Sequence, residues 1–115
     1  MSDPYDLERF VEAQNPVYEE VLAELRRGRK ETHWMWFIFP QLRGLGHSWM
    51  SHKYGISSQA EAGAYLAHPI LGPRLMACKR LVESHAGVPL ESIFGPLDAM
   101  KFRSCMDLFF KRGTA

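Results

Sequence analysis

Apolar residues recur three and four positions apart along most of the chain. Residues 7–11 and 17–25 both follow this spacing, which places apolar side chains on one face of a helix. Between them, Asn15 is expected to cap the second helix, with Pro16 at its first position. Gly28 is expected to end that helix among basic residues, which complement the negative end of a helix dipole.

The second half of the chain carries similar signals. Ser58 and Glu61 match a capping box and predict a helix that begins there. Pro73 is expected to open another helix, Pro89 a short turn, and Asp98 is expected to cap a last helix. Nothing alternates with period two over enough residues for a sheet. We therefore predict an all-α fold, a compact single domain over residues 1–115 with about five to six short helices.

The segment 33–39 is apolar on every side, so periodicity does not decide its structure. A buried strand would lack a partner in the rest of the sequence, which favours a short buried helix capped by Thr32 and interrupted by Pro40. The following stretch, residues 41–56, is rich in Gly, Ser and His and is typical of a loop. A loop of that length is either functional or poorly ordered.

Composition is that of an ordinary globular protein, with 46% hydrophobic and 23% charged residues. The start of the chain is polar, unlike a signal peptide, and two cysteines allow one bridge at most. We therefore expect reduced thiols and a cytoplasmic location. The longest apolar run, residues 34–40, is far shorter than the roughly 20 residues of a membrane span.

Net charge is +1, but its distribution is uneven. Residues 1–32 hold eight carboxylates and five Lys or Arg, whereas residues 33–80 hold one carboxylate and five Lys or Arg. A middle segment of this kind suits an anionic partner. The alternative is that charge placement in a short chain fluctuates by chance. A basic stripe is not evident, so a nucleic-acid partner is not expected.

Few residues are arranged in patterns typical of catalysis. The histidines stand singly and no cysteine pair is close in sequence, so we expect no metal site and no cofactor. Cys105 lies near Lys101 and Arg103, but its spacing from neighbouring apolar residues favours an inert, buried thiol. If the domain is an enzyme, a question that the sequence leaves open, His33 is the one obvious general acid or base.

The strongest candidate for a site is the aromatic segment Thr32–Gly46. His33, Gln41 and Arg43 lie among indole and phenyl rings. The indole faces would stack a planar ring, and the three polar side chains would hydrogen-bond its edge or a phosphate. The alternative is that His33 and Gln41 satisfy buried backbone groups around Pro40. With secondary candidates at helix boundaries, the expected ligand-binding residues are His33, Trp36, Gln41, Arg43, Lys53, Tyr54, Lys101 and Arg103.

Two hypotheses of function follow. In the first, the domain binds a small anionic or nucleotide-like ligand near His33–Gly44. In the second, it is a non-enzymatic protein-interaction module, and the same segment belongs to its core. Convergence of His33, Gln41, Arg43 and Lys53 or Arg103 on one open pocket would favour the first hypothesis.

The chain resembles an uncharacterised bacterial family, the domain of unknown function 1810 (DUF1810). The resemblance covers nearly the whole chain and is most specific at His33–Gly46, with further matches at 7–10, 54–56, 61–62, 65–75, 93–95 and 98–104. It implies a mainly helical fold and no known activity. Some members carry the label calpastatin, but nothing here resembles a disordered protease-inhibitor repeat.

Two departures from the family pattern stand out. The family usually has a serine where this chain has Cys105, which weakens a catalytic role for the thiol. Similar members also continue past Leu108 and Phe109 with another helix. We therefore expect the domain to lack that C-terminal helix, and its C-terminal apolar face to be available for a homodimer.

Overall fold

The structure, a computed structural model, describes residues 3–111. Over this part of the chain it is all-α, as predicted: eight α-helices, five of them seven residues or longer, and no strand. The elements are α1 (Glu8–Gln14), α2 (Tyr18–Arg27), α3 (Met35–Ile38), α4 (Trp49–Lys53), α5 (Gln59–Ala67), α6 (Leu71–Glu83), α7 (Leu90–Phe94), α8 (Pro96–Met106) and a π-helical turn, η1 (Asp107–Lys111). The expectation about a missing C-terminal helix concerns the chain from residue 112 on, which lies outside the described residues.

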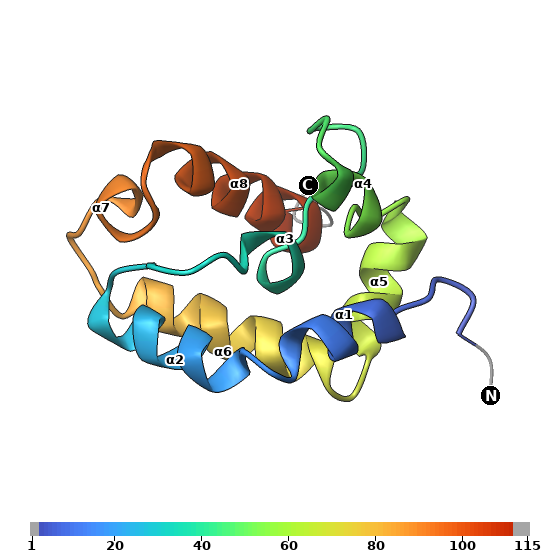
Figure 1. Cartoon of the computed structure of the whole chain (residues 1–115), viewed down its shortest axis with the longest axis horizontal. Helices are drawn as coiled ribbons and strands as arrows, with labels where there is room; N and C mark the ends of the chain where they lie inside the picture. The colour runs from blue at the N-terminus through green and yellow to red at the C-terminus, as the bar shows by residue number, and fades with distance from the viewer. Residues whose placement is uncertain (1–2, 112–115) are drawn as a thin grey trace.

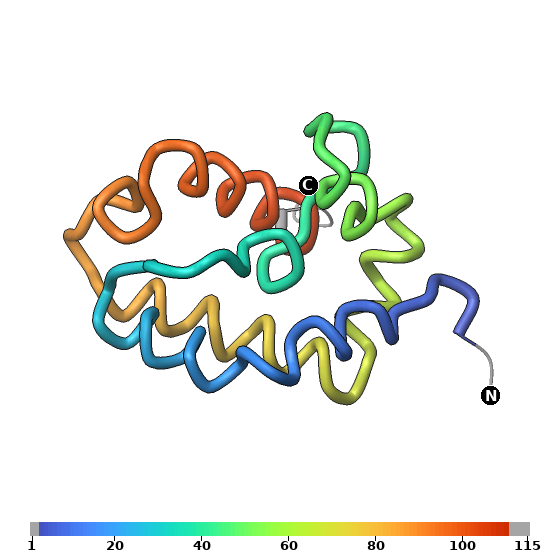
Figure 2. The backbone as a smooth tube through the Cα atoms, in the orientation of Figure 1, coloured from blue at the N-terminus to red at the C-terminus, as the bar shows by residue number. Residues whose placement is uncertain are grey.

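The helices surround a central segment that contains α3 (Figure 1). On one side α2 packs along α6, and α1 contacts α3. On the other side α7 and α8 follow one another, and α4 and α5 lie at one end of the molecule (Figures 1 and 2). The radius of gyration, 13.5 Å, is close to that of a compact domain of about 100 residues.

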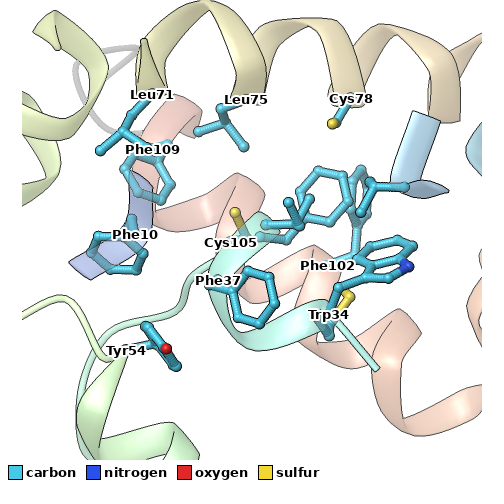
Figure 3. Packing of buried hydrophobic residues seen from close by; sticks show 14 of the residues in the cluster. Phe10, Trp34, Phe37, Tyr54, Leu71, Leu75, Cys78, Phe102, Cys105 and Phe109 are labelled. Carbon is cyan, nitrogen blue, oxygen red and sulfur yellow. The ribbon is translucent and has the colours of Figure 1, made fainter. Parts of the chain in front are cut away.

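The aromatic segment forms the centre of the core, as the sequence analysis expected for its apolar members. Trp34 and Phe37 are buried there (Figure 3), and Phe39 is buried as well. The Phe39 ring lies 4.9 Å from that of Phe102 on α8, edge to face, a favourable geometry for aromatic pairs. Trp36 is only half-buried and faces outward. One segment therefore supplies both the core and a surface aromatic.

Several helix ends agree with the sequence signals. Gly28 ends α2 in the left-handed conformation, with φ 74°, which glycine adopts without a steric penalty. The Ser58 hydroxyl accepts a hydrogen bond of 3.1 Å from the Glu61 backbone N–H and caps α5. The Glu61 carboxylate bonds to Ser57 rather than to Ser58, so the capping box is only half formed.

Other boundaries differ from the expectation. Asn15 does not cap α2, because it continues the helical conformation of α1 and donates its backbone N–H to the Val11 carbonyl. Helix α8 begins before Asp98, since Gly95 at φ 83° turns the chain and Pro96 takes the first helical position. Helix α6 likewise starts two residues before Pro73, which sits in the first turn, where a proline is tolerated.

The stretch 41–56, expected to be a loop, contains the short helix α4. The Ser48 hydroxyl caps it by accepting a 3.1 Å hydrogen bond from the Ser51 backbone N–H. The two ends of the stretch are joined by a single parallel bridge between Leu42 and Ile56. Its hydrogen bonds run from Arg43 N–H to the Ile56 carbonyl and from Ile56 N–H to the Gln41 carbonyl, each 2.8 Å. The segment is therefore a loop whose two ends are hydrogen-bonded to each other.

Candidate functional site

Trp36 and Lys101 are the two predicted site residues in closest contact. The Lys101 ammonium lies 3.8 Å from the centroid of the Trp36 ring, well within the range of a cation–π interaction. It also lies 3.3 Å from one carboxylate oxygen of Asp98, one turn earlier on α8. This contact joins the aromatic segment to the last helix at the molecular surface.

A polar hollow of about 80 Å³ lies on one side of this contact. Its lining includes Lys30, His33, Trp36, Asp98 and Lys101. The Lys30 ammonium is almost buried and lies 2.9 Å from the second Asp98 oxygen, so two cations share one carboxylate. The hollow therefore carries an excess of positive charge next to an exposed imidazole.

An apolar groove of about 260 Å³ lies beside the same contact. Trp36 and Lys101 line both the groove and the polar hollow, so the two hollows adjoin. The other lining residues are Gln41, Leu45, Gly46, Leu97, Met100 and Ser104. Leu45, Leu97 and Met100 are 60%, 72% and 62% exposed, respectively, so the groove presents apolar side chains to solvent.

A third hollow, of about 250 Å³, lies beyond Ser104 between the 42–45 stretch and η1. It shares Leu45 and Ser104 with the groove and adds Leu42, Gln59, Asp107 and Leu108, so its lining is mixed. Leu108 and Phe109, around which we expected a dimer face, are themselves buried against the chain. The exposed apolar side chains of this region belong instead to α8 and to the 42–45 stretch.

The remaining predicted site residues face elsewhere. The Arg43 Nε donates to the His52 carbonyl at 3.1 Å, and Arg103 pairs with Glu91 on α7 at 2.9 Å. The Lys53 ammonium lies 5.1 Å from the Trp49 ring and 5.3 Å from the Tyr54 ring. Each of these three cations thus has a local partner, and none of them lines the polar hollow or the apolar groove.

Tyr54 is buried and lines neither the polar hollow nor the apolar groove. With Trp36 and Gln41 it lines a narrow cleft of about 10 Å³, which is at the lower limit for holding a water molecule. Of the eight predicted residues, the structure therefore gathers His33, Trp36, Gln41 and Lys101 around the two hollows. It adds Asp98, Met100 and Ser104, which lie in the same 98–104 segment as Lys101, and Lys30, for which the sequence carries no signal.

Glu24 positions the segment that leads into the site. Its buried carboxylate accepts hydrogen bonds from the Glu31 backbone N–H, from the backbone and hydroxyl of Thr32, and from the Trp34 indole, at 2.6–3.1 Å. Burial raises the pKa of Glu24, but these hydrogen bonds outweigh burial and lower it to about 2. Thr32 therefore donates to Glu24 instead of capping α3, which begins at Met35.

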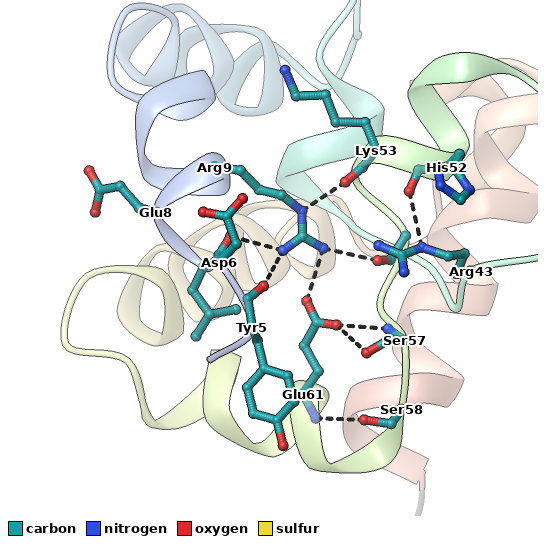
Figure 4. Close-up of polar contacts among 12 residues, drawn as sticks. Tyr5, Asp6, Glu8, Arg9, Arg43, His52, Lys53, Ser57, Ser58 and Glu61 are labelled. Carbon is teal, nitrogen blue, oxygen red and sulfur yellow. Dashed lines mark hydrogen bonds and ion pairs between the residues drawn. The ribbon is translucent and has the colours of Figure 1, made fainter. Parts of the chain in front are cut away.

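Arg9 fixes the stretch behind the narrow cleft (Figure 4). Its guanidinium donates to the carbonyls of Lys53 and Gly55, at 2.7 and 3.0 Å, and to the Glu61 carboxylate at 2.9 Å. The same guanidinium also bonds to the carbonyls of Tyr5 and Asp6. Arg9 is not recognisable from the sequence, because an arginine on an amphipathic helix has the pattern of an ordinary surface charge.

Neither cysteine of the chain is an accessible nucleophile. Cys78 and Cys105 are free and buried, and burial raises the pKa of both thiols, to about 12 for Cys78. Among residues 3–111, no three His, Cys, Asp or Glu side chains are grouped as metal ligands. Nor does any helix in this range have the length and apolar character to cross a membrane.

Comparison with known proteins gives a family without an assigned activity. Among curated proteins, none matches the chain. A similar solved structure is the conserved hypothetical protein Rv1873 from Mycobacterium tuberculosis, with 59% identity and a TM-score of 0.93. The match covers 95% of this chain and 78% of that one. The family model described as "Protein of unknown function (DUF1810)" matches residues 4–115. The chain therefore belongs to the DUF1810 family.

Proposed function

We propose that the domain binds a small anion at the Lys101–Trp36 contact. The observation that carries the proposal is the polar hollow, where two ammonium groups, those of Lys30 and Lys101, share the single carboxylate of Asp98, and His33 completes the polar lining. An ammonium group has three N–H donors. Asp98 and the Trp36 ring take up two sides of Lys101, whose side chain is 25% exposed, and this leaves room for a carboxylate or phosphate oxygen.

The arrangement favours an anion over a stacked base. The Lys101 ammonium covers one face of the Trp36 ring, so a planar ring would have to displace it from that face. The polar groups that remain for orienting a ligand are the His33 imidazole, the Gln41 amide and the Ser104 hydroxyl. A binding role is proposed without a reaction, and the cytoplasmic location stays a prediction from the sequence.

Isothermal titration calorimetry with inorganic phosphate and with acetate tests the proposal. Hydrogen bonds to charged groups contribute about 1.5–3 kcal/mol, so Lys101→Met is expected to weaken binding about 10- to 100-fold. Arg103→Met is the matched control, because it removes a cation from the same helix that pairs with Glu91 and lies outside both hollows. The absence of binding to the wild-type protein, or an equal loss in both variants, contradicts the proposal.

A second candidate is the protein-interaction module in the form of a homodimer. The observation that favours it is the exposure of Leu97 and Met100 on α8, which line the apolar groove together with exposed Leu45. A second copy of the same face would bury these side chains. Light scattering coupled to size exclusion tests this: a dimer that Leu97→Ser/Met100→Ser converts to a monomer supports it, and a wild-type monomer at high concentration rules it out.

A further inference from the structure

We infer that the anion bound at Lys101 is the head of an amphiphilic molecule, whose apolar body lies in the groove along α8. This inference rests on the proposed function and adds the chemical class of the ligand. The structural reason is that the cationic hollow and the apolar groove share Trp36 and Lys101 as lining residues. A ligand held by the ammonium therefore has the groove directly beside it.

The groove is apolar over most of its lining. Leu45 comes from the stretch before α4, and Leu97 and Met100 come from α8, so opposite walls present aliphatic side chains. Its uncharged side chains with polar atoms are Gln41, Ser104 and the Trp36 indole, and most of the remaining lining is aliphatic. A sugar or a peptide backbone would leave most of its polar atoms unpaired there, which is costly. An alkyl chain or a single aromatic ring would leave none unpaired.

The size of the groove limits the apolar body. A volume of about 260 Å³ equals that of about eight or nine water molecules in the liquid. This is room for a short alkyl chain or one ring with a short linker. The hollow beyond Ser104 has a mixed lining that includes Gln59 and Asp107 as well as Leu42 and Leu108, so the apolar body is assigned to the groove alone. The ligand class is thus a monoalkyl or monoaryl phosphate or carboxylate of medium length.

The test is calorimetry with a series of ligands that share one head group: inorganic phosphate, then ethyl, butyl, hexyl and octyl phosphate, all below their critical micelle concentrations. Burial of each methylene in the groove is expected to tighten binding about two- to fourfold, with a plateau when the groove is filled. Alkyl trimethylammonium ions of the same lengths are expected not to bind, because their charge repels Lys101 and Lys30.

One variant and its control separate the contribution of the ligand's anionic head group to binding from that of its apolar body. In the Leu97→Ser/Met100→Ser variant, the affinity is expected to depend little on the length of the ligand's alkyl chain. Inorganic phosphate is expected to bind this variant as it binds the wild type. Both side chains are mostly exposed, so the variant is expected to fold normally. Val88→Ser, an exposed apolar residue outside both hollows, is the matched control.

The outcomes distinguish the two proposals. If all phosphates bind with equal affinity, the amphiphile is excluded and the anion site stands. If none binds, the anion site itself fails. If the alkyl ammonium series binds as well as the phosphates, the groove takes up apolar chains without regard to charge, and the inference is overturned.

Discussion

The Arg9 guanidinium and the Glu61 carboxylate form an ion pair of 2.9 Å whose side chains are only 10% and 2% exposed. Arg9 belongs to α1 and Glu61 to the first turn of α5. The pair holds the stretch 53–57 between them through backbone carbonyls and Ser57 (Figure 4). Two distant helices and one irregular segment thus depend on a single buried pair.

Arg9→Met is expected to lower the free energy of unfolding by about 3–5 kcal/mol, because it leaves a buried carboxylate without its cation. Urea denaturation measures this loss. Arg27→Met is the matched control: Arg27 is half-exposed in its pairs with Glu20 and Glu31, and its loss is expected to cost less than about 1 kcal/mol. Similar losses in both variants would show that the Arg9 network contributes little.

The Glu24 carboxylate predicts a specific acid sensitivity. Its pKa is lowered from 4.5 to about 2 in the folded state, so the unfolded chain takes up the proton first as pH falls. The associated stability is fully present above about pH 4.5 and is lost toward pH 2, and amounts to about 3 kcal/mol.

Glu24→Gln tests this assignment through stability measured against pH. We expect the variant to be less stable at pH 7 and to lose less stability than the wild type between pH 4.5 and 2. Glu31→Gln, at a half-exposed carboxylate, is expected to follow the wild-type profile. If Glu24→Gln also follows that profile, the acid dependence arises elsewhere.

Two helical glycines are expected to respond in opposite directions to alanine. A Cβ at Gly72 would collide with the backbone carbonyl of Leu66, whereas a Cβ at Gly63 would meet nothing within 4 Å. Gly63→Ala is therefore expected to stabilise the domain by about 0.5–1 kcal/mol. Gly72→Ala is expected to destabilise it, since backbone atoms must move. Thermal unfolding of the pair decides, and a stabilised Gly72→Ala would show that α5 and α6 separate easily.

The two cysteines are expected to be unreactive in the native protein. Cys78 and Cys105 are buried, and burial raises the pKa of both thiols. The thiolate is the reactive form, so a thiol reagent at pH 8 is expected to modify neither until denaturant is added. Rapid modification of either thiol in native buffer would reveal an opening motion of α6 or α8.

The parts of the fold that the sequence predicts well are those set by local chemistry. Gly28 and Ser58 act on their own helix ends, and periodic apolar residues mark α2 and α6. Helix α4 was missed, because five residues in a Gly- and Ser-rich stretch give no periodic signal. Asn15 was misread, because the choice between ending one helix and capping the next depends on tertiary packing.

The sequence predicted only part of the candidate site, because tertiary contacts decide which side chains meet there. Trp36, Gln41 and Lys101 were recognised as a polar and aromatic set, and they do meet. Arg43 and Arg103 were chosen for their charge, but a nearby carbonyl and Glu91 take up their guanidinium groups. Some cations pair with a neighbouring group and others face a hollow. Contacts between residues distant in sequence decide this, and one amino-acid sequence does not show such contacts.

The contact between Trp36 and Lys101 joins the first third of the chain to its last long helix. No contiguous fragment that ends before α8 contains both walls of the groove. The domain cannot be shortened to a minimal peptide that keeps the groove. Limited proteolysis between α6 and α7 would therefore yield two pieces that must reassociate before the recognition surface exists again.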